Sequence, residues 1–332
     1  MGATTNDLFG GANGAEPATP GSYGEPPSGF RLPAATRLGP VRLDIADLAR
    51  SLDFYTGTLG LRISERDGAR AVLAANGAAR PLVELVERPG ARPAPHRGRL
   101  GLYHFAILLP DRPSLGQFAQ HLAEVGARAG AGDHLVSEAL YLQDPDNLGI
   151  EVYADRPRSS WRRVGRQLMM ATDPVDVAGL VRAGGGTRWS GMPAGTVMGH
   201  VHLHVGAIEP AAAFFSEALG FDRTVWSYPG ALFLSAGGYH HHLGANTWAG
   251  VGARAPEAGD TRLAEWTIEL PEAASVAAAA ASASSAGYAM EWDGADVVAR
   301  DPWGTQVRLS VGRAVNPTPS IQPEPAKAAR AP

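Results

Sequence analysis

Three histidines alternate with apolar residues in the stretch Gly-His-Val-His-Leu-His-Val, residues 199–205. An alternation of period two predicts a half-buried strand, with His200, His202 and His204 on one face and the apolar side chains on the other. Imidazole is the commonest metal ligand in proteins and titrates near neutral pH. Since His240–His242 forms a second cluster, we expect a functional pocket rather than a row of solvated polar residues.

The composition restricts which metal such a pocket could hold. The chain has 332 residues, 45% of them hydrophobic, and no cysteine. Disulfides, thiolate ligands and a thiol nucleophile are therefore excluded. His, Asp and Glu ligands favour Fe(II), Mn(II) or Zn(II) over Cu(I) or an iron–sulfur cluster.

The net charge and the hydropathy pattern limit which classes of binding partner we expect. The net charge is −4, with no long run of one sign, so neither a nucleic acid nor a membrane is an expected partner. The chain begins with no basic segment followed by an apolar one, and no apolar run could span a bilayer. These features predict a cytoplasmic location, and a closed homo-oligomer is the default expectation for such a protein.

The elements that must position the histidines form a repeat. Residues 39–155 and 199–312 each contain two copies of a β-α-β-β-β pattern, which makes four modules of an α+β fold. The segment 156–198 is predicted to be a linker with one helix. Residues 1–38 and 313–332 are rich in Gly, Pro, Ala, Thr and Ser and are predicted to be disordered tails.

Three stretches of the chain carry a resemblance to a known family. They are residues 101–111, residues 133–146 with 149–157, and residues 199–205 with 237–248, the last two segments carrying the two histidine clusters. They resemble the vicinal oxygen chelate (glyoxalase/bleomycin resistance/extradiol dioxygenase) superfamily, and within it the bacterial four-module catechol 2,3-dioxygenases. The resemblance covers roughly residues 39–312. It implies four βαβββ modules paired into two curved mixed-sheet half-barrels.

The resemblance also implies a metal site of two histidines and one glutamate. In the family, one histidine opens the first strand of one module, and the partner module supplies the second histidine and the glutamate. Module two supplies His104 and Glu151, and module three supplies His200. The set implies that modules two and three pair around the metal, whereas modules three and four do so in the commoner arrangement. The division at 156–198 into two domains therefore remains open.

Modules one and four lack this ligand set. Module one has Pro40 at the ligand position of its first strand. Module four has Glu265 on its first strand, but Arg308 stands where the carboxylate of the last strand should be. A cation at that position would repel a metal ion.

Further residues match the family's substrate-binding groups. His241 matches the acid/base histidine, with His240 and His242 as alternatives if the register shifts by one. Tyr141 matches a tyrosine that hydrogen-bonds a substrate oxygen, and His134 matches a second pocket histidine. In the alternative interpretation, these two are an ordinary strand residue and an ordinary loop residue.

The surroundings of the site are less defined by sequence. His202 and His204 are candidates for hydrogen bonding to the ligand face. The aromatic residues Trp248, Phe105 and Trp226 are candidates for the apolar wall around a ring. His96 and His121 are interpreted as loop and helix-surface residues without a role.

The function implied is that of an extradiol dioxygenase, which inserts O2 into a small aromatic diol beside its hydroxyls at a mononuclear Fe(II) site; Mn(II) would suit the same ligands. Two alternatives stay open. A glyoxalase-like lyase or isomerase would need a second carboxylate where this chain has the triple-histidine segment. A small-molecule-binding protein of the same fold would need no metal ligands at all.

Overall fold

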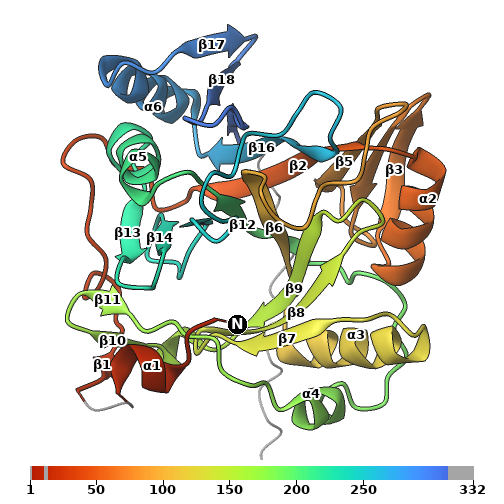
Figure 1. Ribbon diagram of the computed structural model, residues 1–332. Helices are drawn as coiled ribbons and strands as arrows, with labels where there is room; N and C mark the ends of the chain where they lie inside the picture. Colours follow the sequence, from red (N-terminus) through yellow and green to blue (C-terminus); the bar gives the residue numbers. More distant parts are fainter. Residues whose placement is uncertain (1, 11–13, 313–332) are drawn as a thin grey trace, which may run out of the picture.

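A computed structural model describes residues 2–10 and 14–312, and it contains two eight-stranded mixed sheets (Figure 1). We call the first the inner sheet, because its strands come from the middle of the chain, in the order β13-β14-β15-β12-β6-β9-β8-β7. Its strands are β6 (Gly101–Leu108), β7 (Gly130–Asp133), β8 (Ser137–Gln143), β9 (Gly149–Asp155), β12 (Val197–His204), β13 (Asp222–Val225), β14 (Ala231–Ser235) and β15 (Leu243–Asn246).

The second sheet, here the outer sheet, has the order β17-β18-β19-β16-β2-β5-β4-β3 and joins the two ends of the chain. Its strands are β2 (Arg37–Ile45), β3 (Arg62–Asp67), β4 (Arg70–Ala74), β5 (Pro81–Glu87), β16 (Arg262–Leu270), β17 (Met290–Asp293), β18 (Asp296–Arg300) and β19 (Gln306–Val311). In each sheet an antiparallel pair lies at the centre, β12 with β6 and β16 with β2. The predicted α+β fold of four modules in two curved mixed sheets is confirmed.

Each module has its helix directly after its first strand, as the β-α-β-β-β pattern predicts. These helices are α2 (Leu48–Leu52) with a π-helical turn at Asp53–Thr58, α3 (Arg112–Glu124), α5 (Ile208–Ala211) with a π-helical turn at Ala212–Ala218, and α6 (Ala273–Ser285). The predicted linker helix is α4 (Val177–Ala183), which packs on α3. Asp47, Asp111 and Asp176 cap three of these helices by accepting a backbone N–H. No helix in the described ranges is long and apolar enough to cross a membrane.

The chain does not enter the sheets in consecutive pairs of modules. Modules two and three form the inner sheet, and modules one and four form the outer sheet. The ranges 39–155 and 199–312 therefore do not delimit the structural halves, whereas the pairing implied by the His104, Glu151 and His200 set is the one observed. The long connection, residues 156–196, is what allows this, because it carries the chain from β9 back to the centre of the same sheet.

Residues 2–10 and 14–38 are ordered, in contrast to the predicted disordered tail of residues 1–38. Helix α1 (Thr5–Phe9) begins at a capping box on Thr4, and β1 (Glu16–Pro17) pairs with β10 (Arg162–Val164), which pairs with β11 (Gln167–Leu168). Tyr23 and Leu32 are buried among residues of the core. A few apolar anchors and hydrogen bonds to the linker hold this segment, and average composition does not reveal them. The predicted tail 313–332 lies outside the described residues.

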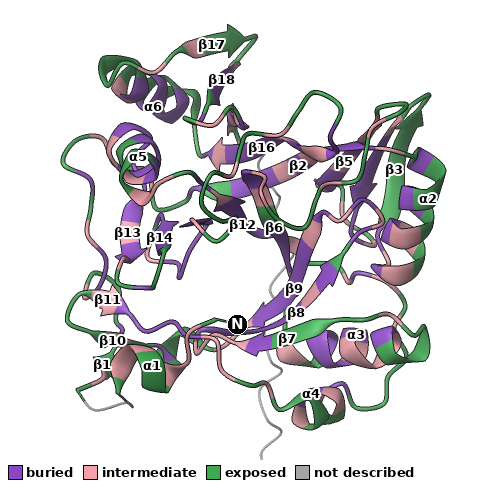
Figure 2. Cartoon of the chain, in the orientation of Figure 1, coloured by how far each residue is buried: buried purple, intermediate pink, exposed green. Residues whose placement is uncertain are grey.

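Burial follows the two central strand pairs. Figure 2 shows β6, β9 and β12 largely buried, whereas β3 and β17 at the edges of the outer sheet are mostly exposed.

The last strands of modules two and four each follow a turn that is closed by a buried aspartate. Asp144 accepts N–H groups at 2.8 and 2.9 Å from Asp146 and Leu148, and Asp301 accepts those of Trp303 and Thr305 at 2.9 Å. These turns fix where β9 and β19 begin.

Candidate active site

One row of side chains crosses the centre of the inner sheet. In register, Glu151 of β9 faces Ala106 of β6, and Ala106 faces His200 of β12. The small side chain of Ala106 between them lets the carboxylate and the imidazole meet above it. Tyr141 of β8 extends the row as the cross-strand neighbour of Glu151.

The next row on the same face holds His104 and His202, which are neighbours across β6 and β12. Two glycines make room for this row. A Cβ at Gly149 would lie 1.9 Å from the carbonyl oxygen of Tyr103, so only glycine lets β9 approach β6 here. A Cβ at Gly244 would lie 2.8 Å from the His202 ring, so the imidazole has space only because residue 244 is a glycine.

The predicted metal ligands converge on one point. The Nε2 atoms of His104 and His200 lie 3.0 and 3.2 Å from the same Glu151 oxygen, and the three ligand atoms lie within 4.8 Å of one another. All three side chains are buried, with Glu151 only 2% exposed. His200 Nε2 hydrogen-bonds Glu151 at 3.2 Å, but His104 Nε2 makes no properly directed hydrogen bond within the described protein, so the three groups satisfy one another only in part. Two imidazoles and a carboxylate gathered in this way fit a divalent cation.

Burial also sets the protonation of these groups. It lowers the pKa of His104 and of His200, despite the opposing carboxylate. Burial alone would raise the pKa of Glu151, but the facing imidazoles outweigh it and hold the pKa well below its usual range. Neutral imidazole and ionised carboxylate are the forms that bind metal ions.

His134 and Tyr141 form a hydrogen-bonded pair beside the ligands. His134 Nδ1 donates to the carbonyl oxygen of Ala171 at 2.7 Å, since a carbonyl can only accept. In a neutral ring, Nε2 is then the acceptor of the Tyr141 hydroxyl. Burial raises the pKa of Tyr141 well above its usual value, so the phenol keeps its proton.

The triple-histidine segment is a loop rather than the beginning of a strand, and its three rings have different partners. His241 lines the pocket, with its ring centroid 4.0 Å from that of His200. His240 Nε2 donates to the Asp155 carboxylate at 3.0 Å, and its Nδ1 lies 2.6 Å from Nδ1 of His241. His242 accepts from the Ala236 backbone at 3.2 Å, away from the pocket.

This chain of contacts orients His241. The carboxylate of Asp155 can only accept, so His240 Nε2 carries a proton. A neutral His240 then accepts at Nδ1, and the donor there is His241 Nδ1. His241 Nε2 is left as an unprotonated acceptor, which is the form a general base requires.

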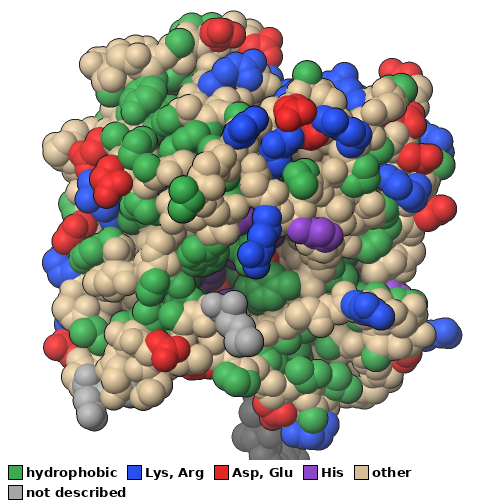
Figure 3. Space-filling view, viewed as in Figure 1, with side chains coloured by type: hydrophobic (Ala, Val, Ile, Leu, Met, Phe, Trp, Pro, Cys, Tyr) green, Lys and Arg blue, Asp and Glu red, His purple; other side chains and the backbone are tan. Residues whose placement is uncertain are grey.

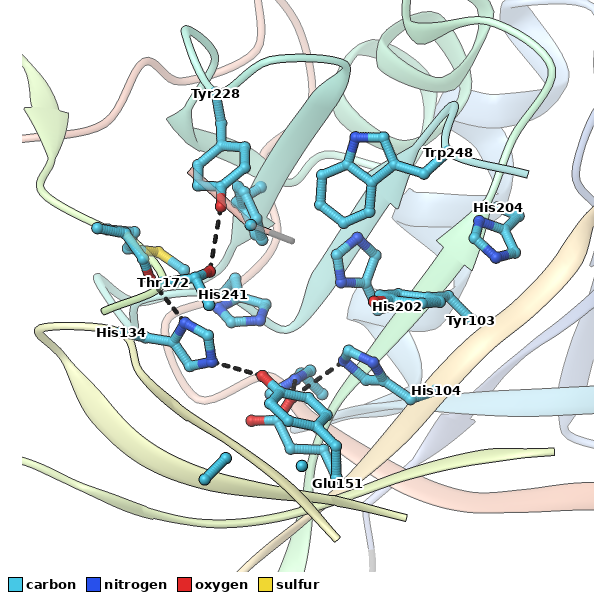
Figure 4. Close-up of a pocket in the computed structure, with 18 of the residues that line it drawn as sticks. Tyr103, His104, His134, Glu151, Thr172, His202, His204, Tyr228, His241 and Trp248 are labelled. Atoms are coloured by element: carbon cyan, nitrogen blue, oxygen red, sulfur yellow. Dashed lines mark hydrogen bonds and ion pairs between the residues drawn. The ribbon is translucent and has the colours of Figure 1, made fainter. Parts of the chain in front are cut away.

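The ligands open into a cavity of about 490 Å³, shown in Figure 4. All six predicted site residues line it. Its other walls are mainly aromatic or small: Gly2, His96, Arg97, Tyr103, Gly130, Ala131, Met170, Ala171, Thr172, His202, His204, Tyr228, Phe233 and Trp248. In Figure 3 this face of the molecule is hollowed near its centre, with a Lys or Arg and a His side chain at the edge of the hollow.

Three expectations about the walls need revision. Of the aromatic candidates, Trp248 lines the cavity, but Phe105 is buried in the core on the other face of β6, and Trp226 does not reach the pocket. His96, given no role from sequence, lies at its edge. Tyr103, Tyr228 and Phe233 carry no motif. Phe233 could have been found by alternation, because it lies in register with Gly244 and His202. Alternation places Tyr103 on the opposite face with Phe105, but a bulge in β6, where His202 pairs with His104 and Leu203 with Leu102, leaves Tyr103 as the extra residue, and its side chain lines the cavity.

The outer sheet holds an ion pair where the inner sheet holds the metal ligands. Arg308 of β19 donates to both carboxylate oxygens of Glu265 at 2.9 and 3.1 Å, and Arg42 adds a contact at 3.6 Å. The arginine thus neutralises the carboxylate that a metal would otherwise require. Among the described residues, His104, Glu151 and His200 are the one group of His, Asp and Glu side chains placed so that they could hold a metal ion.

Four βαβββ modules paired into two mixed sheets, with a buried His-His-Glu group on one of them, define a class of protein. Residues 37–152 match the family model for the Glyoxalase/Bleomycin resistance protein/Dioxygenase superfamily. A curated relative matches most of the chain at 46% identity. The chain belongs to this vicinal oxygen chelate superfamily and is a dioxygenase-like enzyme within it.

The relative is the catechol-2,3-dioxygenase of Bacillus subtilis (strain 168), aligned over 259 residues, 77% of this chain and 90% of that protein. Solved structures share the fold at low identity. A Bacillus subtilis subsp. subtilis str. 168 protein assigned as a dioxygenase has 12% identity and a TM-score of 0.58, covering 85% of this chain and 86% of its own. Glyoxalase I from Zea mays has 18% identity and a TM-score of 0.50, covering 83% and 92%.

Proposed function

We propose that this protein is an extradiol dioxygenase that cleaves a catechol beside its two hydroxyls. The observation that carries the proposal is the buried convergence of His104, Glu151 and His200 at the floor of an aromatic-lined cavity that also contains His241 and Tyr141. The identity with a catechol-2,3-dioxygenase over most of the chain supports the same reaction.

His104, His200 and Glu151 would hold the metal, which we propose is Fe(II), with Mn(II) as the alternative that suits the same ligands. When bound, the metal supplies Lewis acidity and open positions for two catechol oxygens and O2. His104, Glu151 and His200 all line the cavity, so a metal that they held would be accessible to a substrate bound there.

The remaining residues handle protons and orientation. His241 Nε2 accepts a proton from a catechol hydroxyl, because its Nδ1 is committed to His240. The Tyr141 proton is directed to His134, so the phenol oxygen accepts from the second hydroxyl. The aromatic walls hold the ring and keep bulk water away from the reacting oxygens.

The first test is anaerobic loading with Fe(II), followed by catechol and O2, with the visible spectrum as readout. A yellow semialdehyde product, with one O2 consumed per catechol, is expected. A colourless muconate would contradict cleavage beside the hydroxyls. Untouched O2 with stoichiometric metal would favour a glyoxalase-like reaction.

Variants of the ligands test the metal site separately. His104→Ala, His200→Ala and Glu151→Gln should each weaken metal binding by roughly 100-fold or more, since even partners that only support a ligand contribute 10–100-fold. His121→Ala, a helix-surface histidine away from the cavity, is the matched control and should keep the metal. Full metal content in Glu151→Gln would contradict the assignment.

A further inference from the structure

We propose that the preferred substrate is a catechol whose ring carries a short side chain ending in a carboxylate, bound by His202 and Arg97. This rests on the proposed function and names its substrate class. Arg97 and Glu151 are the charged side chains of the cavity wall, and Glu151 belongs to the metal site. Apart from Glu151, the described lining therefore carries one charged side chain, the Arg97 guanidinium.

Strand β12 runs along the cavity, so the spacing of its residues gives the distance from the candidate metal site. His200, His202 and His204 lie on one face, and two residues of a strand advance about 7 Å. A catechol held at the His200 end spans about that length, so its ring edge opposite the hydroxyls reaches His202. A substituent there continues toward His204. Figure 4 shows His202 between Trp248 and the His104–Glu151 pair, with His204 beyond Tyr103.

His202 has an unused polar atom at this position. The residue is 4% exposed, and its Nε2 has no hydrogen-bond partner within the described protein. Rings surround it, with centroids of His104, Tyr103 and Trp248 at 5.0, 5.1 and 5.5 Å. A buried unpaired nitrogen is costly. A polar atom on the substrate is the partner this arrangement leaves room for.

The far end of the cavity is cationic. His96, Arg97, Tyr103 and His204 line both this cavity and an adjoining one of about 110 Å³, so they mark where the two meet. His204 is fixed there by a 2.7 Å hydrogen bond from Nδ1 to Asn246. An anionic group at the end of a substituent that extends along β12 toward His204 would lie at this junction.

Arg97 is available to bind that group. Its neighbours Arg92 and Arg99 are both engaged by Glu257 and Asp260, at 2.6 to 3.0 Å. Arg97 is exposed and has no carboxylate partner in the described part of the chain. A guanidinium and a carboxylate form paired, charge-assisted hydrogen bonds, which a neutral substituent cannot replace.

The test compares two catechols substituted at the same ring position, one with a carboxymethyl and one with an ethyl group. The metal-loaded enzyme should favour the carboxymethyl compound by roughly 10-fold or more in kcat/KM, as expected for a hydrogen bond to a charged group. Anaerobic titration calorimetry should show the same preference in Kd, and added salt should reduce it.

Variants locate the effect. Arg97→Gln should cut the preference about tenfold, mainly through KM, whereas Arg92→Gln removes an equal charge from the same loop and should preserve it. His202→Leu should weaken binding of the carboxymethyl compound, and His202→Gln should restore part of it. Metal content and unfolding midpoints verify that each variant is folded.

The outcomes separate the two proposals. Equal turnover and Kd for both compounds would overturn the substrate class and leave the dioxygenase function standing. An unchanged preference in Arg97→Gln would also overturn it. Cleavage of no catechol would overturn the dioxygenase function, and the anaerobic Kd values would then decide the carboxylate preference alone.

Discussion

At the scale of single residues, protonation in this site is arranged by hydrogen-bond partners that do not touch the metal ligands. Asp155 lies two contacts from the cavity, yet it determines which nitrogen of His240 carries a proton, and so which nitrogen of His241 is free. Tyr239 donates to the same Asp155 oxygen at 3.1 Å and holds the carboxylate in place. The acid/base function proposed for His241 therefore depends on a residue outside the pocket.

We predict that Asp155→Asn lowers kcat by roughly 100-fold, within the range of general acid–base contributions. The new amide can donate to His240 Nε2, which reverses both histidines and places a proton on the nitrogen of His241 that should accept one. Metal content and anaerobic catechol binding should be unchanged. Tyr239→Phe, which leaves the bond between Asp155 and His240, is the control; an equal loss there would indicate a general structural effect.

The candidate metal ligands could be predicted from single residues because the family resemblance assigns ligand positions within a module. His104 and Glu151 recur at defined places in a module, and Pro40 and Arg308 remove the competing modules. The walls could not be predicted in the same way. Tyr228 and Thr172 reach the cavity from a loop and from the linker, and no spacing in the sequence relates those segments to β12.

At the scale of elements, two features position the ligands: the aspartate turns and the close strand contact at Gly149. Burial raises the pKa of Asp144 to about 6 and that of Asp301 to about 6 as well. Both carboxylates accept backbone N–H groups, and Tyr55 donates to Asp144 at 3.1 Å. Each turn thus contains a carboxyl group whose ionised form is disfavoured by burial in the folded chain.

For Asp144 the consequence is a pH-dependent stability of defined sign. Its folded pKa lies above the usual 3.8, so the folded chain holds the proton more tightly, and the free energy of unfolding falls as pH rises from about 4 to about 6. Asp144→Asn keeps the acceptor and removes the charge. It should be more stable than the parent at pH 7 by about 3 kcal/mol, at about 1.4 kcal/mol per pKa unit.

Urea unfolding at pH 4, 5, 6 and 7 measures this difference. The advantage of Asp144→Asn should shrink toward pH 4, where the parent carboxyl is also neutral, and Asp301→Asn should behave alike in module four. Asp47→Asn, an exposed helix cap, is the comparison. A variant less stable than its parent at every pH would show that the ionised carboxylate stabilises the turn.

Gly149→Ala should separate β9 from β6. The added methyl would lie 1.9 Å from the Tyr103 carbonyl, and relief of such overpacking costs about 1–3 kcal/mol. Because Glu151 follows two residues later, metal affinity should fall together with the free energy of unfolding. Gly57→Ala, where nothing lies within 4 Å, is the control and should be neutral. Unchanged metal affinity in a destabilised Gly149→Ala would contradict the coupling.

Element types could largely be predicted from alternation and caps. Differences arose where local contacts override the pattern: the helices after Asp47 and Ala207 end in π-helical turns. His240 and His241 lie in a loop, where their rings contact Asp155 and each other, and backbone pairing with β12 and β14 begins at His242.

At the scale of the whole molecule, the N-terminal segment completes the cavity. Gly2 lines it, the backbone of Ala3 donates to the Tyr228 hydroxyl at 2.9 Å, and Thr5 donates to Asp173 at 2.9 Å. The backbone N–H of Thr172 in turn donates to the carbonyl oxygen of Ala3 at 2.8 Å. Residues far apart in sequence are thereby joined over one wall of the pocket.

We predict that deleting residues 1–10 raises KM for catechols several-fold while metal content stays complete, because the wall is opened but the ligands are untouched. Tyr228→Phe, which removes one anchor and keeps the segment, should show a smaller increase. Steady-state kinetics and metal analysis measure both. An unchanged KM in the deletion variant would show that the segment does not shape the substrate site.

The nested pairing of modules has a consequence for the order of folding. The inner half closes when β15 joins β12, before module four has been synthesised, whereas β2 must wait for β16, with Val41 opposite Trp266. The entropy cost of closing a loop grows with its length, and a folded insert shortens the effective loop. We therefore expect the inner half to assemble first on the ribosome, and the outer sheet to join the two ends of the chain last.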